Sequence, residues 1–273
     1  MALNIKALAE KFAELSGEKK KKSYAPPFPV WKPMLTEDGK AKTYNIRCLP
    51  VEYAGQPFYE IGYYDNKKLS PFRLVAPAQF GLPDPVSELV AELNKDRKNS
   101  KNAWNTIRPL LPQSRFLAPI LVREEKEKGV QVYEISKNLC KKFYQNFLDD
   151  EYRDEPLHDA LIGRDFKLTV SPSGKEFKNE TTGKTYPVND VDIRPAGKTS
   201  KLAATQEEID KLVASVPNFD EIFKGQVKSY DDLAEMLRKY LDVDASAISG
   251  SASSDDATDD ALLKSVEDQF NGL

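Results

Sequence analysis

The sequence has little of what most metal and nucleophile sites are built from. Its 273 residues include one histidine, His158, and two cysteines, Cys48 and Cys140. These are too few for the usual Cys/His zinc site, and their spacing does not suggest a Cys–His nucleophile. The sequence also lacks the phosphate-binding loops GxxxxGK(S/T) and GxGxxG and the zinc-protease motif HExxH. We therefore expect a protein that is not an enzyme and that needs neither a metal ion nor another cofactor.

Long hydrophobic runs are missing as well. No stretch approaches the roughly 18 consecutive apolar residues of a transmembrane helix. The first residues lack the compact apolar segment and small-residue cleavage site of a secretory signal. The two cysteines lie far apart in apolar surroundings, as is typical of reduced, buried thiols. These features predict a cytoplasmic protein without membrane contact, in the host cytoplasm if the source is a virus.

The charge of the chain is unevenly distributed. The formal net charge is −3, but residues 19–142 carry 23 basic and 13 acidic residues, a charge of +10. Residues 244–273 carry seven acids and one base, a charge of −6. A basic central region joined to an acidic tail predicts a polyanionic partner, with which the tail competes for the basic region.

The N-terminal segment, residues 1–23, is predicted to mediate self-association. Residues 4–16 have the periodicity of an amphipathic helix, and a lysine-rich linker follows. This helix either packs on its own domain or docks on a neighbouring copy, and its separation by a charged linker favours the second. Its apolar face consists of Ile5, Leu8, Phe12 and Leu15.

The C-terminal segment, residues 244–273, is predicted to be a flexible acidic tail. Its first half is small and polar, so it cannot bury enough apolar surface to offset the entropy of ordering. Apolar residues recur at helical spacing among the acids near its end, which suggests a segment that recruits partner proteins. The alternative is a tail that only aids solubility. The candidate recruiting residues are Asp255, Asp256, Asp259, Asp260, Leu262, Leu263 and Phe270.

Between these segments, residues 24–243 are predicted to form an α+β core. Alternating patterns predict strands at 43–49, 57–64, 114–123, 130–135, 164–171 and 186–193. Helical periodicity predicts helices at 86–98, 136–148, 205–215 and 229–241. Pro119 suggests an edge strand or a bulge, and residues 171–186 suggest a long hairpin loop. Short strands, hairpins and a few helices favour a partly open antiparallel barrel of the oligonucleotide-binding type, although other α+β folds fit the same count.

Basic residues are interleaved with aromatic residues throughout this core. Single-stranded nucleic acid needs this mixture, because cations neutralise phosphates and aromatic faces stack on exposed bases, at roughly 1–3 kcal/mol per base. Any one of these aromatics is more often a core residue, so the recurrence carries the prediction. The candidate contacts are Arg47, Phe58, Tyr59, Tyr63, Tyr64, Arg73, Lys101, Trp104, Arg108, Arg115, Phe116, Lys175 and Phe177.

The order of several motifs resembles one protein family. The motifs are YNIRCLP from Tyr44, DPVSELV from Asp84, RFLAPILV from Arg115, VQVYEISKNLCKKF from Val130 and the acidic end SSDDATDDALLKSVEDQFNGL. In this order they are similar to the single-stranded DNA-binding, helix-destabilising proteins of T-even-type bacteriophages. The likeness extends over nearly the whole chain.

The resemblance implies an oligonucleotide-binding barrel that coats single-stranded DNA cooperatively and without sequence preference in replication, recombination and repair. It implies that the N-terminal segment contacts neighbouring copies and that the acidic tail recruits replication and recombination proteins. By motif position it places residues along the binding groove: Arg47, Phe116, Lys137, Lys141, Lys142, Lys175 and Phe177.

One position departs from the family pattern. Well-known members hold zinc with one histidine and three cysteines, but here Asp84 and Ser87 stand where two of the cysteines would fall, and Tyr63 and Tyr64 occupy the histidine region. We therefore expect no zinc and a subdomain held by packing of its prolines and of the helix from Val86. Two other functions stay open on the sequence: RNA binding, and a scaffold that acts only through protein contacts.

Overall fold

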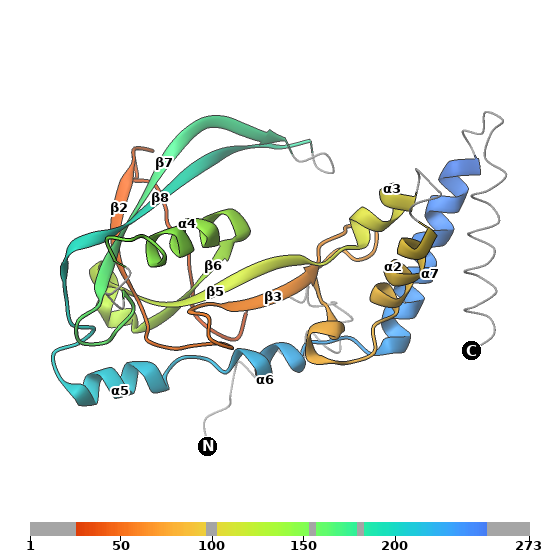
Figure 1. Cartoon of the computed structure of the whole chain (residues 1–273). Helices are drawn as coiled ribbons and strands as arrows, with labels where there is room; N and C mark the ends of the chain where they lie inside the picture. Colours follow the sequence, from red (N-terminus) through yellow and green to blue (C-terminus); the bar gives the residue numbers. More distant parts are fainter. Residues whose placement is uncertain (1–25, 97–102, 153–156, 179–182, 250–273) are drawn as a thin grey trace, which may run out of the picture.

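Figure 1 shows the chain as a computed structural model, which describes residues 26–96, 103–152, 157–178 and 183–249. The predicted N-terminal helix and the recruiting residues of the tail lie outside the described residues, so their roles stay predictions. Within the described residues, no helix is both long enough and apolar enough to cross a membrane.

The strands and helices predicted for the core, residues 24–243, all correspond to elements of the structure. The strands are β1 (Val30–Trp31), β2 (Lys42–Cys48), β3 (Tyr59–Tyr64), β4 (Leu74–Val75), β5 (Gln113–Val122), β6 (Val130–Ser136), β7 (Arg164–Lys178) and β8 (Thr185–Thr199). The α-helices are α2 (Pro85–Asp96), α3 (Ala103–Ile107), α4 (Lys137–Phe147), α5 (Gln206–Ala214), α6 (Phe219–Lys224) and α7 (Tyr230–Ser249). Three 3₁₀ helices are η1 (Pro77–Phe80), η2 (Arg108–Leu110) and η3 (Arg123–Lys128).

The described strands form one sheet in the order β1-β6-β5-β2-β7-β8, with β3 also paired to β5 and β4 paired to β3. No pairing within the described residues returns β8 to β1 or β6. The mixed α+β class is thus confirmed, whereas the partly open oligonucleotide-binding barrel stays a prediction.

Strand β5 lies at the centre of the sheet. One of its edges pairs with β6, and the other pairs first with β3 and then with β2. Pro119 lies where the partner changes from β3 to β2, and its carbonyl accepts from the Leu49 amide at 3.0 Å. Proline has no N–H. Because the N–H and C=O of a strand residue are directed to the same side, the absent donor of Pro119 faces this same junction, where no described strand needs it as a partner. The expectation of an edge or a bulge at Pro119 is therefore wrong.

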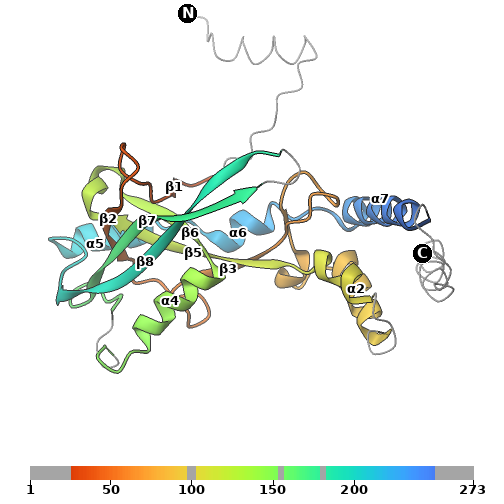
Figure 2. The ribbon, with the colours of Figure 1, turned by 90° about the horizontal axis from the view of Figure 1, so that it is seen from above.

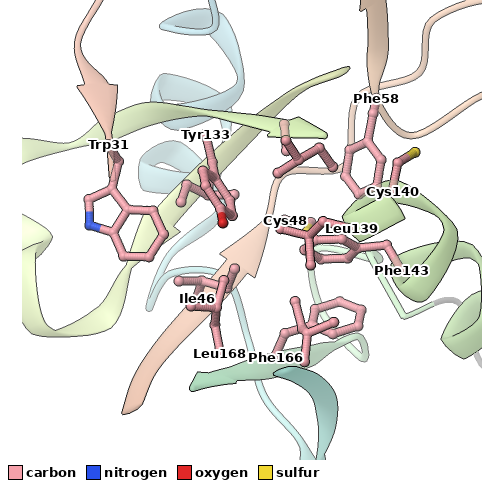
Figure 3. Packing of buried hydrophobic residues seen from close by; sticks show 14 of the residues in the cluster. Trp31, Ile46, Cys48, Phe58, Tyr133, Leu139, Cys140, Phe143, Phe166 and Leu168 are labelled. Atoms are coloured by element: carbon pink, nitrogen blue, oxygen red, sulfur yellow. The ribbon is translucent and has the colours of Figure 1, made fainter. Parts of the chain in front are cut away.

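The two faces of the sheet are covered by different helices (Figure 1). Helix α4 covers one face, and its N-terminus is capped by Ser136, whose Oγ accepts from the Leu139 amide at 3.3 Å. Figure 3 shows the core on this side, where Phe143 of α4 meets Phe58 and Phe166. Helices α5 and α6 run along the opposite face. Sequence periodicity missed α6, because six residues are too few to show a period.

A second apolar cluster joins α2, α3 and α7 at one end of the molecule. Val86 and Leu89 of α2 pack with Ile107 of α3 and with Leu233 and Leu237 of α7. Helix α7 continues through Ser249, past residue 244, where the sequence placed the start of the acidic tail.

Strands β7 and β8 are much longer than predicted. After a register shift between Pro172 and Glu176, the ladder resumes with Phe177 opposite Tyr186 and Lys178 opposite Thr185. The prediction of a long loop over 171–186 is therefore wrong for its described part. We call residues 172–178 and 185–190 the arm; it points toward the end of the molecule that carries α2, α3 and α7 (Figures 1 and 2).

Both cysteine side chains are free and buried, as predicted. Burial raises the pKa of the Cys48 thiol to about 12 and raises that of Cys140 above its ordinary value. Since the thiolate is the reactive form, we expect neither thiol to react with Ellman's reagent at pH 8 in the folded protein. Both should react at once in denaturant. Fast stoichiometric labelling of the native chain would contradict this burial.

Candidate nucleic-acid interface

Part of the predicted contact set lies in the core. Five of its members are at most 9% exposed: Arg47, Phe58, Tyr59, Tyr64 and Phe116. The ring of Phe58 packs edge-on against Phe143, with 5.0 Å between centroids. The ring of Tyr59 stacks on Phe223 of α6, with 6.0 Å between centroids. These side chains have no face left for a base or a phosphate, so the sequence-based assignment fails for all five.

The charge of Arg47 is balanced by a buried network. Its Nη2 donates to the carbonyl oxygens of Asp159 and Ser200, the latter at 2.9 Å, and its Nη1 lies 3.6 Å from Asp165 Oδ1. Burial lowers the pKa of the guanidinium, and the Asp165 carboxylate opposes that shift. Arg47 therefore holds the fold together, and it is not a phosphate contact.

The chain around this network is fitted closely to the guanidinium. Asp165 also binds Arg123, at 2.8 and 3.0 Å. A Cβ added to Gly163 would lie 2.6 Å from Arg47 Nη2 and 2.7 Å from the Leu157 carbonyl oxygen. Only glycine fits there without displacing the arginine or the backbone.

Three further candidates lie on the face that α6 covers. The ring of Tyr63 contacts an α6 ring at 6.2 Å, and the guanidinium of Arg73 lies 5.9 Å from the Tyr63 centroid. Glu134 Oε1 accepts from Arg73 Nη1 at 2.8 Å and lies 3.4 Å from Arg115 Nε. Arg73 also donates to Asp65 at 3.1 Å. Carboxylates already neutralise Arg73 and Arg115. Together with Tyr63, these arginines lie on the face that α6 covers, apart from the candidates on α4 and the arm.

Helix α4 presents three lysines at the opposite face. Lys137 and Lys141 are exposed, lie one turn apart and make no ion pair with any described residue. Lys142 donates to the Val191 carbonyl oxygen of β8 at 2.6 Å, which ties the helix to the strand from which the arm projects. Lys137 and Lys141 are thus available to phosphates, whereas Lys142 has a structural bond.

The arm carries the most exposed aromatic pair among the described residues. Phe177 and Tyr186 are 59% and 47% exposed and lie directly opposite each other, so the two rings share one face of the ribbon. Val188 adds an exposed apolar residue. Lys175 and Lys178 are exposed beside them and make no ion pair with a described residue. Aromatic faces and uncompensated cations therefore occur together at this place.

The remaining candidates lie at the end of the molecule that carries α2, α3 and α7. Trp104 of α3 is 38% exposed, and Arg108 at the start of η2 is exposed. Lys101 lies outside the described residues. The arm points toward this end of the molecule.

Sequence reasoning missed Tyr186, Val188 and Lys178. Phe177 fell within the predicted loop, and Tyr186 at its boundary with the strand predicted at 186–193, so their pairing could not be read from the sequence. The alternation of Tyr186 and Val188 continues that of the strand behind them, and this was the available signal.

Residues 39–241 match a family described as gp32 DNA binding protein like. The chain belongs to this family. The match covers β2 to β8, α4, the arm and most of α7, so the resemblance inferred from motif order is confirmed. No curated protein matches the chain.

In this gp32-like chain, the positions expected for zinc ligands form a hydrogen-bonded cluster. Asp84 is buried, and its Oδ2 accepts from the hydroxyls of Tyr64 at 2.6 Å and Ser87 at 3.1 Å. Its Oδ1 accepts from the Val86 amide at 3.1 Å. Burial raises the pKa of Tyr64 and the hydrogen bond to Asp84 raises it further, so its hydroxyl stays protonated and keeps donating.

This donor set does not fit zinc. It offers one carboxylate, whose lone pairs are used, and two neutral hydroxyls, but neither a thiolate nor an imidazole. Among the described residues, no group of three or more His, Cys, Asp or Glu side chains could hold a metal ion. The sequence predicted packing alone at this place; the structure adds a buried carboxylate that joins β3, η1 and the start of α2.

We expect Asp84→Ala to lower the free energy of unfolding by about 1–3 kcal/mol, because it leaves the buried Tyr64 hydroxyl without its acceptor. Urea denaturation measures this. The exposed Asp192→Ala is the control and should change little. A chelator should leave the thermal midpoint of the unaltered chain in place, and a clear fall on chelation would show that a metal supports this region.

Proposed function

We propose that this protein binds single-stranded DNA through the arm and α4. The observation that carries the proposal is the exposed Phe177–Tyr186 pair beside Lys175 and Lys178. Membership of the gp32 DNA binding protein-like family supports DNA as the partner.

The chemistry of the arm favours single strands over a duplex. An exposed aromatic ring gains free energy by stacking on an unpaired base, whereas a duplex keeps its base faces stacked on each other. Stacking needs no particular base, so this surface binds without sequence preference. Lys137 and Lys141 of α4 supply phosphate contacts beside β8, from which the arm projects.

Trp104 and Arg108 are proposed to extend the interface toward α3, and Lys101 would join them there. Binding is proposed to be cooperative, with the N-terminal segment, residues 1–23, contacting the neighbouring copy on the strand. The further proposal, supported by motif order, is a role in phage DNA replication, recombination and repair, with the acidic tail recruiting partner proteins. The oligonucleotide-binding barrel belongs to the same proposal.

We expect Phe177→Ala with Tyr186→Ala to weaken oligothymidylate binding by about 1–3 kcal/mol for each stacking base lost, with the salt dependence retained. Fluorescence titration of the full chain measures this. Phe72→Ala is the matched control, because Phe72 is 57% exposed and lies next to Arg73 on the α6 side. Equal losses in the two variants, or no binding at low salt, would refute the proposed site.

Lys137→Gln with Lys141→Gln should act differently. Each phosphate contact to a single strand contributes about −0.7 to the slope of log affinity against log salt. Removing two contacts should flatten the slope by roughly 1 to 1.5 and weaken binding equally for all sequences. The same titration at four salt concentrations measures the slope, and an unchanged slope would remove α4 from the interface. A parallel series with oligouridylate determines whether RNA binds as well.

A further inference from the structure

A cavity of about 670 Å³ lies between α5 and the sheet face opposite α4. Its accessible apolar surface comes from Ala203, from Ala204 and from Leu212 of α5, and the buried Leu121 and Leu202 lie beneath them. This volume lies within the usual range for sites that hold a ligand. The arm and α4 are not part of its lining.

The rim of the cavity carries uncompensated positive charge. Lys126, Lys201 and Lys211 line it, are exposed, and make no ion pair with any described residue. Arg123 also lines it, but its guanidinium is held by Asp165 and by the Leu202 carbonyl oxygen.

The one acid among the lining residues does not neutralise this rim. Glu208 Oε2 accepts from the amides of Ala204 at 3.0 Å and Thr205 at 3.2 Å, as part of the capping box of α5. Its carboxylate is therefore engaged with backbone. A ligand that fits the cavity is anionic at its edges and apolar at its centre.

The chain itself contains a segment of this chemistry. In the sequence, Leu262 and Leu263 follow Asp259 and Asp260 after one alanine, and Phe270 follows further acids. We propose that the acidic terminal segment of a second copy docks in this cavity. Its carboxylates face the three lysines, and its leucines pack on Ala203 and Leu212.

The arrangement of the helices favours a second copy over the same chain. Helix α5 lies at one end of the molecule and α7 at the other, with α6 between them (Figures 1 and 2). The terminal segment follows Ser249, the last residue of α7. The twelve residues between Ser249 and Leu262 span at most about 40 Å when fully extended. A terminal segment that docks on a neighbouring copy does not have to run back across its own molecule to reach α5.

The test uses a fluorescent synthetic peptide of residues 250–273 and the full chain without DNA, so its outcome does not depend on strand binding. Lys126→Gln, Lys201→Gln and Lys211→Gln together should weaken peptide binding at least tenfold by fluorescence anisotropy. The matched control, Lys137→Gln with Lys141→Gln, should bind within twofold of the unaltered chain. A peptide with Leu262→Ser and Leu263→Ser should bind at least fivefold more weakly, because charge alone does not fill the apolar walls.

Competition with oligothymidylate tests on which surface the peptide binds. Saturating oligothymidylate should leave the peptide bound, since the cavity and the proposed strand-binding surface lie on opposite faces. Displacement by oligothymidylate together with loss in the α4 variant would place the peptide on the strand-binding surface and overturn the proposal. The proposal would also be overturned if the triple lysine variant kept its thermal midpoint and bound the peptide as tightly as the unaltered chain. The same holds if the unaltered chain did not bind the peptide.

Discussion

The buried charge of Arg47 is the constraint on which the shape of the sheet depends. A guanidinium removed from water must be matched by acceptors, and breaking such a set typically costs about 3–5 kcal/mol. Its acceptors come from Asp159, from Ser200 and from Asp165, which bracket the start of β7 and the end of β8. One side chain of β2 thereby holds β7 and β8 together at the end of their ladder where Arg164 pairs with Thr199, opposite the arm.

The same residue shows where sequence reasoning stops. Alternation located β2 within one residue, because each apolar side chain of a strand responds to its own neighbours. Arg47 was predicted to contact nucleic acid, since a lone arginine in a strand normally faces water. Its acceptors lie 112 and 153 residues away in sequence, and no local pattern reports them. Pro119 was misread for a related reason. A proline is tolerated at this place in a central strand because β5 stops pairing with β3 before it and starts pairing with β2 after it.

The aromatic residues show the same limit of sequence reasoning. Phe58 and Phe177 both lie near basic residues in the sequence, and both were predicted to stack on bases. Phe58 is 1% exposed because the sheet around it is covered by α4, whereas Phe177 is 59% exposed because the arm is a two-stranded ribbon beyond that cover. The order of the motifs identified the right family. Which aromatic residues stay exposed is decided by the layers of the fold, and those follow from tertiary packing.

The two basic surfaces lie on opposite faces, and this bears on how an acidic tail can act. A tail that competes with DNA must reach the arm and α4, and its binding then excludes the strand. A tail held in the cavity beside α5 of a neighbour leaves the strand in place, so both contacts exist at once. Every tail–cavity contact then adds to the affinity of a copy for a strand already coated, because linked contacts raise the effective concentration of each other. High salt weakens both, since each depends on lysines exposed to solvent. In that arrangement the tail couples neighbouring copies, and its acids need not mimic the DNA backbone at all.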